Sequence, residues 1–157
     1  MKQKKIIGIT GGVGAGKSSV LAVLKNDFGA KIILADLVAH DLMEPGSLGL
    51  RKVTEALGTS FLTPDGAVDR KALADLIFRD KEALKTMNSI IHPLVWKTMK
   101  EEAEAASENL VIIEAAVFDT APKNFFDELW YVYTTKENRI VRLMENRGYS
   151  REKCEDI

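Results

Sequence analysis

The chain has 157 residues, of which 46% are hydrophobic and 29% are charged, and its formal net charge at pH 7 is −1. This length and composition suit one domain with a full hydrophobic core, and the small net charge disfavours a surface built for nucleic acid. We therefore expect a small-molecule ligand and no nucleic-acid partner. The single cysteine, Cys154, excludes an internal disulfide and is typical of a reducing compartment.

The sequence contains no run of 18 apolar residues, and the charged stretch Met1–Lys5 is not followed by the apolar region of a secretory signal. We therefore expect a cytoplasmic protein without a membrane partner. The chain ends at Ile157 within a predicted helix and before any fifth strand. We expect the C-terminal part of the protein to lie beyond this residue.

The most informative feature is a glycine-rich segment, Gly11–Ser18, which matches the pattern G-x-x-x-x-G-K-[ST]. A strand-like run, Lys5–Thr10, precedes it, and a helical run, Ser18–Phe28, follows it. A strand, a glycine turn and a helix N-terminus in this order form a phosphate-binding loop. The sequence predicts that Lys17 reaches the terminal phosphates of ATP and that the Ser18 hydroxyl binds Mg²⁺. The predicted ATP-binding residues are Gly12, Val13, Gly14, Ala15, Gly16, Lys17, Ser18 and Ser19.

The second predicted strand, Lys31–Ala35, follows a helix stop at Gly29 and is itself followed by Asp36. A carboxylate beside a phosphate loop can accept a proton from a substrate hydroxyl or hold Mg²⁺ through water. Asp36 is equally suited to be the N-cap of a helix over Leu37–Met43. Both interpretations stay open on the residues alone.

A helical region follows. Glu44–Ser47 breaks the first helix, Asp80 is placed to cap one helix, and Pro93 is placed to begin another. The predicted elements are a helix over Leu48–Leu57 that ends at Gly58, a turn over Thr63–Gly66, and helices over Asp69–Phe78, Lys81–Ile91 and Leu94–Ala106.

The last part of the chain returns to alternating elements. Strands are predicted over Leu110–Ile113 and Leu129–Tyr133, and a charged helix over Lys136–Asn146 ends at Gly148, with Ser150 as the cap of another helix. Strands separated by helices predict a three-layer α/β fold with a mostly parallel sheet. Ligands of such folds bind at the carboxyl ends of the strands. Glu114 lies there, either as an acid of the phosphate site or as a turn residue.

Two further sets of residues have a functional and a structural interpretation. His92 lies before Pro93, where it could contact a ligand or stabilise a helix C-terminus as a cation. Arg139, Arg142 and Arg147 lie on the last charged helix. They could close over a transferred phosphoryl group as part of a lid, or they could form a solvated helix face.

Several segments together resemble the dephospho-coenzyme A kinase family. They are Thr10–Ser18, Ala35–His40, Glu44–Gly46, Ile91–Val95 and Arg139–Ser150, and their order and spacing match the family over nearly the whole chain. The resemblance implies one P-loop kinase domain, a P-loop NTPase fold in which residues 36–107 form a helical coenzyme-binding insertion and residues 136–157 belong to a lid.

The resemblance also implies an activity, the ATP-dependent phosphorylation of the ribose 3′-hydroxyl of dephospho-coenzyme A, which is the last step of coenzyme A biosynthesis. Asp36 would be the general base and, together with Lys17, a catalytic residue, and it could also contribute to the Mg²⁺ site. Asp36, His92 and Glu114 would contact the acceptor. The implied substrates are ATP and dephospho-coenzyme A, and the implied cofactor is Mg²⁺.

The chain departs from the family pattern at two places. Leu34 stands where members often have an aspartate, although the matching catalytic Asp36 remains. After the third strand, the family usually has a proline and two leucines, whereas this chain has Glu114–Asp119, so the wall of the acceptor pocket that the resemblance implies does not carry over at this segment.

Two alternative functions remain open. One is another small-metabolite or nucleoside kinase of the same fold. The other is a module that binds ATP without transferring phosphate. A GTPase or motor is disfavoured, because the sequence has no N-K-x-D motif and no apolar strand that ends in a Walker B aspartate.

Overall fold

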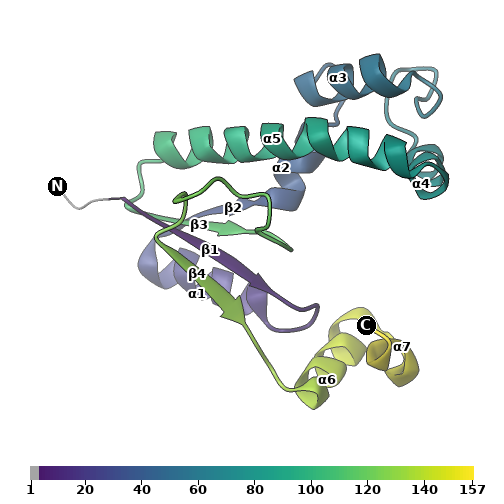
Figure 1. Ribbon diagram of the computed structural model, residues 1–157. Coiled ribbons are helices and arrows are strands. Elements are labelled where there is room, and N and C mark those ends of the chain that lie inside the picture. The colour runs from purple at the N-terminus through teal and green to yellow at the C-terminus, as the bar shows by residue number, and fades with distance from the viewer. Residues whose placement is uncertain (1–3) are drawn as a thin grey trace. The chain divides into compact units, whose positions relative to one another are not determined.

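A computed structural model describes residues 4–157, which form four strands and seven helices (Figure 1). The residues group into two compact units, one with the chain up to Ile33 together with Ala105–Ile157, the other with Leu34–Glu104. The strands are β1 (Lys5–Gly11), β2 (Lys31–Leu34), β3 (Leu110–Glu114) and β4 (Glu128–Val132). The helices are α1 (Lys17–Phe28), α2 (Ala35–Asp41), α3 (Leu48–Leu57), α4 (Arg70–Arg79), α5 (Lys81–Ala105), α6 (Lys136–Arg147) and α7 (Arg151–Glu155).

The sheet has four strands in the order β2-β3-β1-β4. Strand β1 pairs in parallel with β3, where Ile9 lies opposite Glu114, and in parallel with β4, where Gly11 lies opposite Val132. Parallel neighbours need a crossover between them, which the intervening helices provide. The predicted α/β fold with a parallel central sheet is confirmed, and each strand lies within one residue of its predicted bounds.

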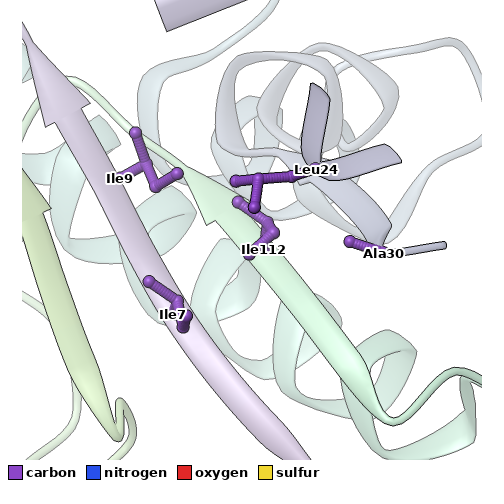
Figure 2. Packing of buried hydrophobic residues seen from close by; sticks show 5 residues of the cluster. All are labelled: Ile7, Ile9, Leu24, Ala30 and Ile112. Carbon is purple, nitrogen blue, oxygen red and sulfur yellow. The ribbon is translucent and has the colours of Figure 1, made fainter. Parts of the chain in front are cut away.

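One face of the sheet packs against α1 through a buried apolar cluster (Figure 2). Ile7 and Ile9 of β1 and Ile112 of β3 lie against Leu24 of α1, and Ala30 closes the cluster beyond the helix end. The two β1 residues are two apart, so both side chains point to the same face of the strand. Apolar burial on this face fixes the direction of α1 and therefore the place where its N-terminus meets the glycine loop.

Several predicted helix ends are confirmed by their capping groups. Gly29 and Gly148 end α1 and α6 in the left-handed conformation. Asp80 accepts hydrogen bonds from the backbone N–H groups of Glu82 and Ala83, at 2.9 and 3.1 Å, and Ser150 caps α7. These short polar residues satisfy donors that have no partner inside the helix.

The second unit is helical, and two predictions for it are wrong. Helix α2 begins at Ala35 rather than Leu37, and its N-cap is Leu34, without a side-chain capping bond. Asp36 therefore lies in the first turn of α2 and is not its cap. A carboxylate in a first turn still interacts favourably with the helix dipole.

The helices predicted on either side of Pro93 are one continuous helix, α5, of 25 residues. An interior proline removes one backbone donor and costs about 3 kcal/mol. The helix continues because its apolar residues keep a helical spacing across the proline, and burial of each such side chain contributes about 1.5–3 kcal/mol. The buried residues are Ala83, Ile91, Val95, Trp96, Met99 and Ala103.

Helices α6 and α7 form a small pair after β4 (Figure 1). Ile140 and Leu143 of α6 pack with Cys154 of α7, and all three are buried. The thiol of Cys154 is free and fully buried, as in a small apolar core residue. Within residues 4–157, no helix is both long and apolar enough to cross a membrane.

Candidate functional site: a phosphate loop braced by helix α6

The glycine loop leaves β1 at Gly11 and enters α1 at Lys17, each one residue from the predicted strand end at Thr10 and the predicted helix start at Ser18. Gly14 and Gly16 have φ values of +76° and +97°, which L-residues rarely adopt. Gly16 is the N-cap of α1 and supplies no side-chain capping bond. The N–H group of Ser19 donates to the carbonyl oxygen of Gly16 at 3.2 Å, but no side chain caps the first turn of α1, and an uncapped helix N-terminus of this kind can bind an anion.

Lys17 folds back across this loop. Its ammonium group donates a hydrogen bond to the carbonyl oxygen of Gly11 at 2.6 Å and another to that of Gly12 at 3.2 Å. An ammonium group has three donors, so one is left for a phosphate oxygen. These two hydrogen bonds within the protein therefore place the ammonium group of Lys17 over the loop.

Helix α6 contacts the loop directly. The guanidinium group of Arg142 donates a hydrogen bond to the carbonyl oxygen of Ala15 at 3.0 Å. A methyl group at Gly14 would lie 2.9 Å from Cγ of Arg139, and one at Gly16 would lie 2.8 Å from Nη1 of Arg142. Two of the three predicted lid arginines therefore lie against the phosphate loop.

The environments of these arginines differ. The Nε atom of Arg139 is buried and has no hydrogen-bond partner, which is uncommon for a buried polar atom. Arg147 is exposed in the last turn of α6 and forms no ion pair with the described residues. The structure brings Arg139 and Arg142 to the loop and leaves Arg147 at the helix end.

Glu114 is the last residue of β3, and its side chain is half-buried. Just beyond it, the N–H group of Ala115 donates to the carbonyl oxygen of Ile9 at 3.2 Å. The hydroxyl of Thr10 then donates to the carbonyl oxygen of Ala116 at 2.8 Å. Thr10 is not among the site residues that the sequence predicts, although it lies directly before the glycine loop, and that position was a signal that could have singled it out.

The other two candidates lie in the helical unit, where Asp36 and His92 are both exposed. Asp36 is in the first turn of α2. His92 lies in the middle of α5, so the interpretation as a helix C-terminal histidine is wrong. Among residues 4–157, neither side chain forms a hydrogen bond or an ion pair.

Strand β4 carries a carboxylate with a shifted pKa, that of Glu128. Glu128 accepts hydrogen bonds from the ammonium group of Lys5 at 2.5 Å and from the indole N–H of Trp130 at 2.7 Å. The hydrogen bond from Lys5, followed by that from Trp130, holds the pKa of Glu128 below its ordinary value. This pair joins β1 to β4 by a charged contact at the ends opposite to the glycine loop.

Comparison with known proteins agrees with this geometry. The family model described as dephospho-CoA kinase matches residues 5–157. The chain belongs to the dephospho-CoA kinase family. Its glycine loop, parallel sheet and helical unit are thus those of a kinase family that transfers phosphate to an alcohol group.

Individual relatives support the assignment. The dephospho-CoA kinase of Carboxydothermus hydrogenoformans is 36% identical over 153 residues, which cover 95% of this chain and 74% of that protein. That of Moorella thermoacetica is 41% identical over 144 residues, which cover 88% and 68%.

Solved structures share the fold. A crystal structure of a protein from Thermus thermophilus superposes with a TM-score of 0.75 at 31% identity, covering 98% of this chain and 78% of that one. The dephospho-CoA kinase of Campylobacter jejuni superposes with a TM-score of 0.62 at 24% identity, covering 98% and 77%, and this likeness concerns the fold alone.

Proposed function

We propose that this chain phosphorylates the ribose 3′-hydroxyl of dephospho-coenzyme A with ATP, giving coenzyme A and ADP. The observation that carries the proposal is the loop, in which the Lys17 ammonium lies across Gly11 and Gly12 at the uncapped N-terminus of α1. Membership of the dephospho-CoA kinase family supplies the acceptor. The reaction then completes coenzyme A biosynthesis, and we place it in the cytoplasm, in keeping with a free cysteine.

The loop has the task of holding ATP. The backbone N–H groups from Gly12 to Ser19 and the ammonium group of Lys17 would bind the β- and γ-phosphates. These groups are already held in position, so they need little rearrangement as charge develops on the transferred group. Positioning and charge stabilisation account for most of the catalysis of phosphoryl transfer.

The donor chemistry fits Mg²⁺, which prefers oxygen ligands and takes few of them from the protein. The Ser18 hydroxyl is exposed in the first turn of α1 and would hold the ion, and Asp36 would contribute a second oxygen donor through water. When bound with ATP, Mg²⁺ neutralises negative charge on the phosphates.

The acceptor side has the task of supplying a reactive hydroxyl. In this proposal, Asp36 accepts the proton of the 3′-hydroxyl as general base, and His92 and Glu114 contact dephospho-coenzyme A. Asp36 is suited to the task because it is exposed and is not occupied as a helix cap. A positioned carboxylate of this kind contributes about 10²–10⁴-fold to the rate.

The arginines of α6 complete the proposal as the lid. Arg139 and Arg142 are already at the loop, and the partnerless Nε of Arg139 is a buried donor that an anion could satisfy. Arg147 would join them from the last turn of the same helix. Their cations would offset the charge on the phosphoryl group during transfer.

The test is ADP release by the full-length protein with Mg²⁺, ATP and dephospho-coenzyme A. Coenzyme A is the matched control, because its 3′ position already carries phosphate, and adenosine tests a nucleoside acceptor. Release that requires dephospho-coenzyme A supports the proposal. Release with adenosine instead indicates a different kinase, and nucleotide binding without release with any acceptor indicates a binding module.

A further inference from the structure

Thr10 lies on β1 immediately before the glycine loop, and its side chain is half-buried. Ile7 and Ile9 point towards α1, so alternation along the strand directs Thr10 to the opposite face. On that face, a methyl group at Gly8 would lie 3.1 Å from Phe118 and 3.1 Å from Phe126. The segment that follows β3 therefore covers this side of β1.

The Thr10 hydroxyl acts where the backbone pairing of β1 with β3 stops. The paired register ends at Ile9 and Glu114, and its last backbone bond runs from Ala115 N–H to Ile9 at 3.2 Å. The chain then leaves the sheet. The 2.8 Å hydrogen bond from Thr10 to the Ala116 carbonyl adds one more cross-strand link past this point.

Glu114 lies next to both of these links, because Ala115 and Ala116 directly follow it. The same short stretch of β1 continues into the phosphate loop, where Gly11 pairs with Val132 of β4. Threonine is β-branched, so its χ1 angle is restricted and its hydroxyl is held in one direction. The Thr10 hydroxyl therefore ties Ala116, two residues after Glu114, to the end of β1 that continues into the phosphate loop.

We propose that Thr10 is a positioning residue for phosphoryl transfer, which ties the chain at Ala116, just after Glu114, to the strand that leads into the phosphate loop. This inference rests on the proposed function and extends it to a residue that contacts neither substrate in the proposal. The Thr10 hydroxyl is directed at Ala116, so its loss should affect turnover more than the binding of ATP. A small misplacement of reacting groups lowers the rate strongly even when binding persists.

The test compares Thr10→Val, which keeps the shape and removes the donor, with Thr10→Ser, which keeps the donor. Thr54→Val is the matched control, because Thr54 is also half-buried and its hydroxyl also donates to a backbone carbonyl at 2.8 Å, that of Arg51 on α3. Measured quantities are kcat, the KM for each substrate, the Kd for ATP and the melting temperature. If Thr10→Val does not fold, Thr10→Ala takes its place.

We expect Thr10→Val to lower kcat by about 10-fold while the Kd for ATP changes by less than about twofold. Thr10→Ser should recover most of the turnover, and Thr54→Val should match the wild type. Unchanged kcat in Thr10→Val, or an equal loss in Thr10→Ser, would overturn the role of Thr10. A wild-type protein without transfer would overturn the proposed function itself.

Discussion

The phosphate loop and the helical unit differ in how firmly the fold holds their candidate residues. In the loop, Lys17 and Arg142 both donate hydrogen bonds to loop carbonyls. In the helical unit, Asp36 and His92 are exposed side chains without such bonds among the described residues. The fold thus holds the candidate residues of the phosphate loop in place, whereas it holds the two residues proposed for the acceptor by no such bonds.

Substitution of Lys17 by alanine should have the largest effect. It removes a cation from the terminal phosphates, where a charge-assisted hydrogen bond contributes about 1.5–3 kcal/mol, and two such contacts correspond to a loss of turnover on the order of 10³-fold. ADP release measures this. Lys25→Ala, on the exposed last turn of α1, is the control and should keep normal turnover. Near-wild-type turnover and ATP affinity in Lys17→Ala would contradict the assignment of the loop.

Asp36→Asn tests the residue proposed as general base on the acceptor side. It removes the proton acceptor, so turnover should fall at least about 100-fold while ATP binding persists. The melting temperature should barely change, because Asp36 is exposed and is not the N-cap of α2. Asp41→Asn at the other end of α2 is the control. A normal turnover in Asp36→Asn would place the general base elsewhere.

His92→Ala should have a smaller and more selective effect. The loss of one neutral hydrogen bond to the acceptor should raise the KM for dephospho-coenzyme A by about 3- to 10-fold and leave the KM for ATP unchanged. Alanine is favourable within a helix, so α5 should not be destabilised. The control is His40→Ala, which removes the other histidine of the chain, an exposed residue 3.3 Å from Glu44. Equal changes in both KM values would contradict a role at the acceptor.

The smallest expected effect is a pH dependence of stability at Glu128. Its pKa is lowered in the folded protein by the hydrogen bond from Lys5. A lowered pKa stabilises the fold above the unfolded value, about 4.3 for glutamate, and this contribution is lost as the pH falls through the folded value. The wild type should therefore melt slightly above Glu128→Gln at pH 7, and the difference should shrink once the pH falls below the unfolded value of about 4.3 and disappear below the lower pKa of the folded protein.

A thermal-shift series across this pH range measures that difference. Glu101→Gln on α5 is the control, since Glu101 lies 3.8 Å from Lys97 in an exposed ion pair. A difference between wild type and Glu128→Gln that grows as the pH falls would contradict the assigned sign.

Local signals account for the parts of the fold that the sequence predicts well. Each strand is a short apolar run, and glycine or a short polar residue marks the helix ends at Gly29, Gly148 and Asp80. The prediction failed at Pro93, because a proline is locally a helix breaker and the apolar stripe that carries α5 across it is buried only in the folded unit. It failed at the start of α2 because Asp36 suits a cap and a first turn equally well.

The candidate site, like the fold, has one part that local sequence predicts and another part that it does not predict. The glycine loop was predictable because its residues are contiguous and their spacing carries the chemistry. The link from Thr10 to Ala116 spans 106 residues, and that from Arg142 to Ala15 spans 127. No local pattern specifies such contacts, since they exist only once β1, β3 and α6 are packed. The roles of Asp36, His92 and Glu114 stay predictions that the variants above test.

The close contact of α6 with Gly14 and Gly16 has a consequence for exchanging segments between family members. Both surfaces have to match, because a side chain on either glycine would meet Arg139 or Arg142 at less than 3 Å. A chimaera that imports residues 136–147 from a relative should therefore also import residues 11–18. The loop and the helix therefore form one packing unit, although more than a hundred residues separate them in the chain.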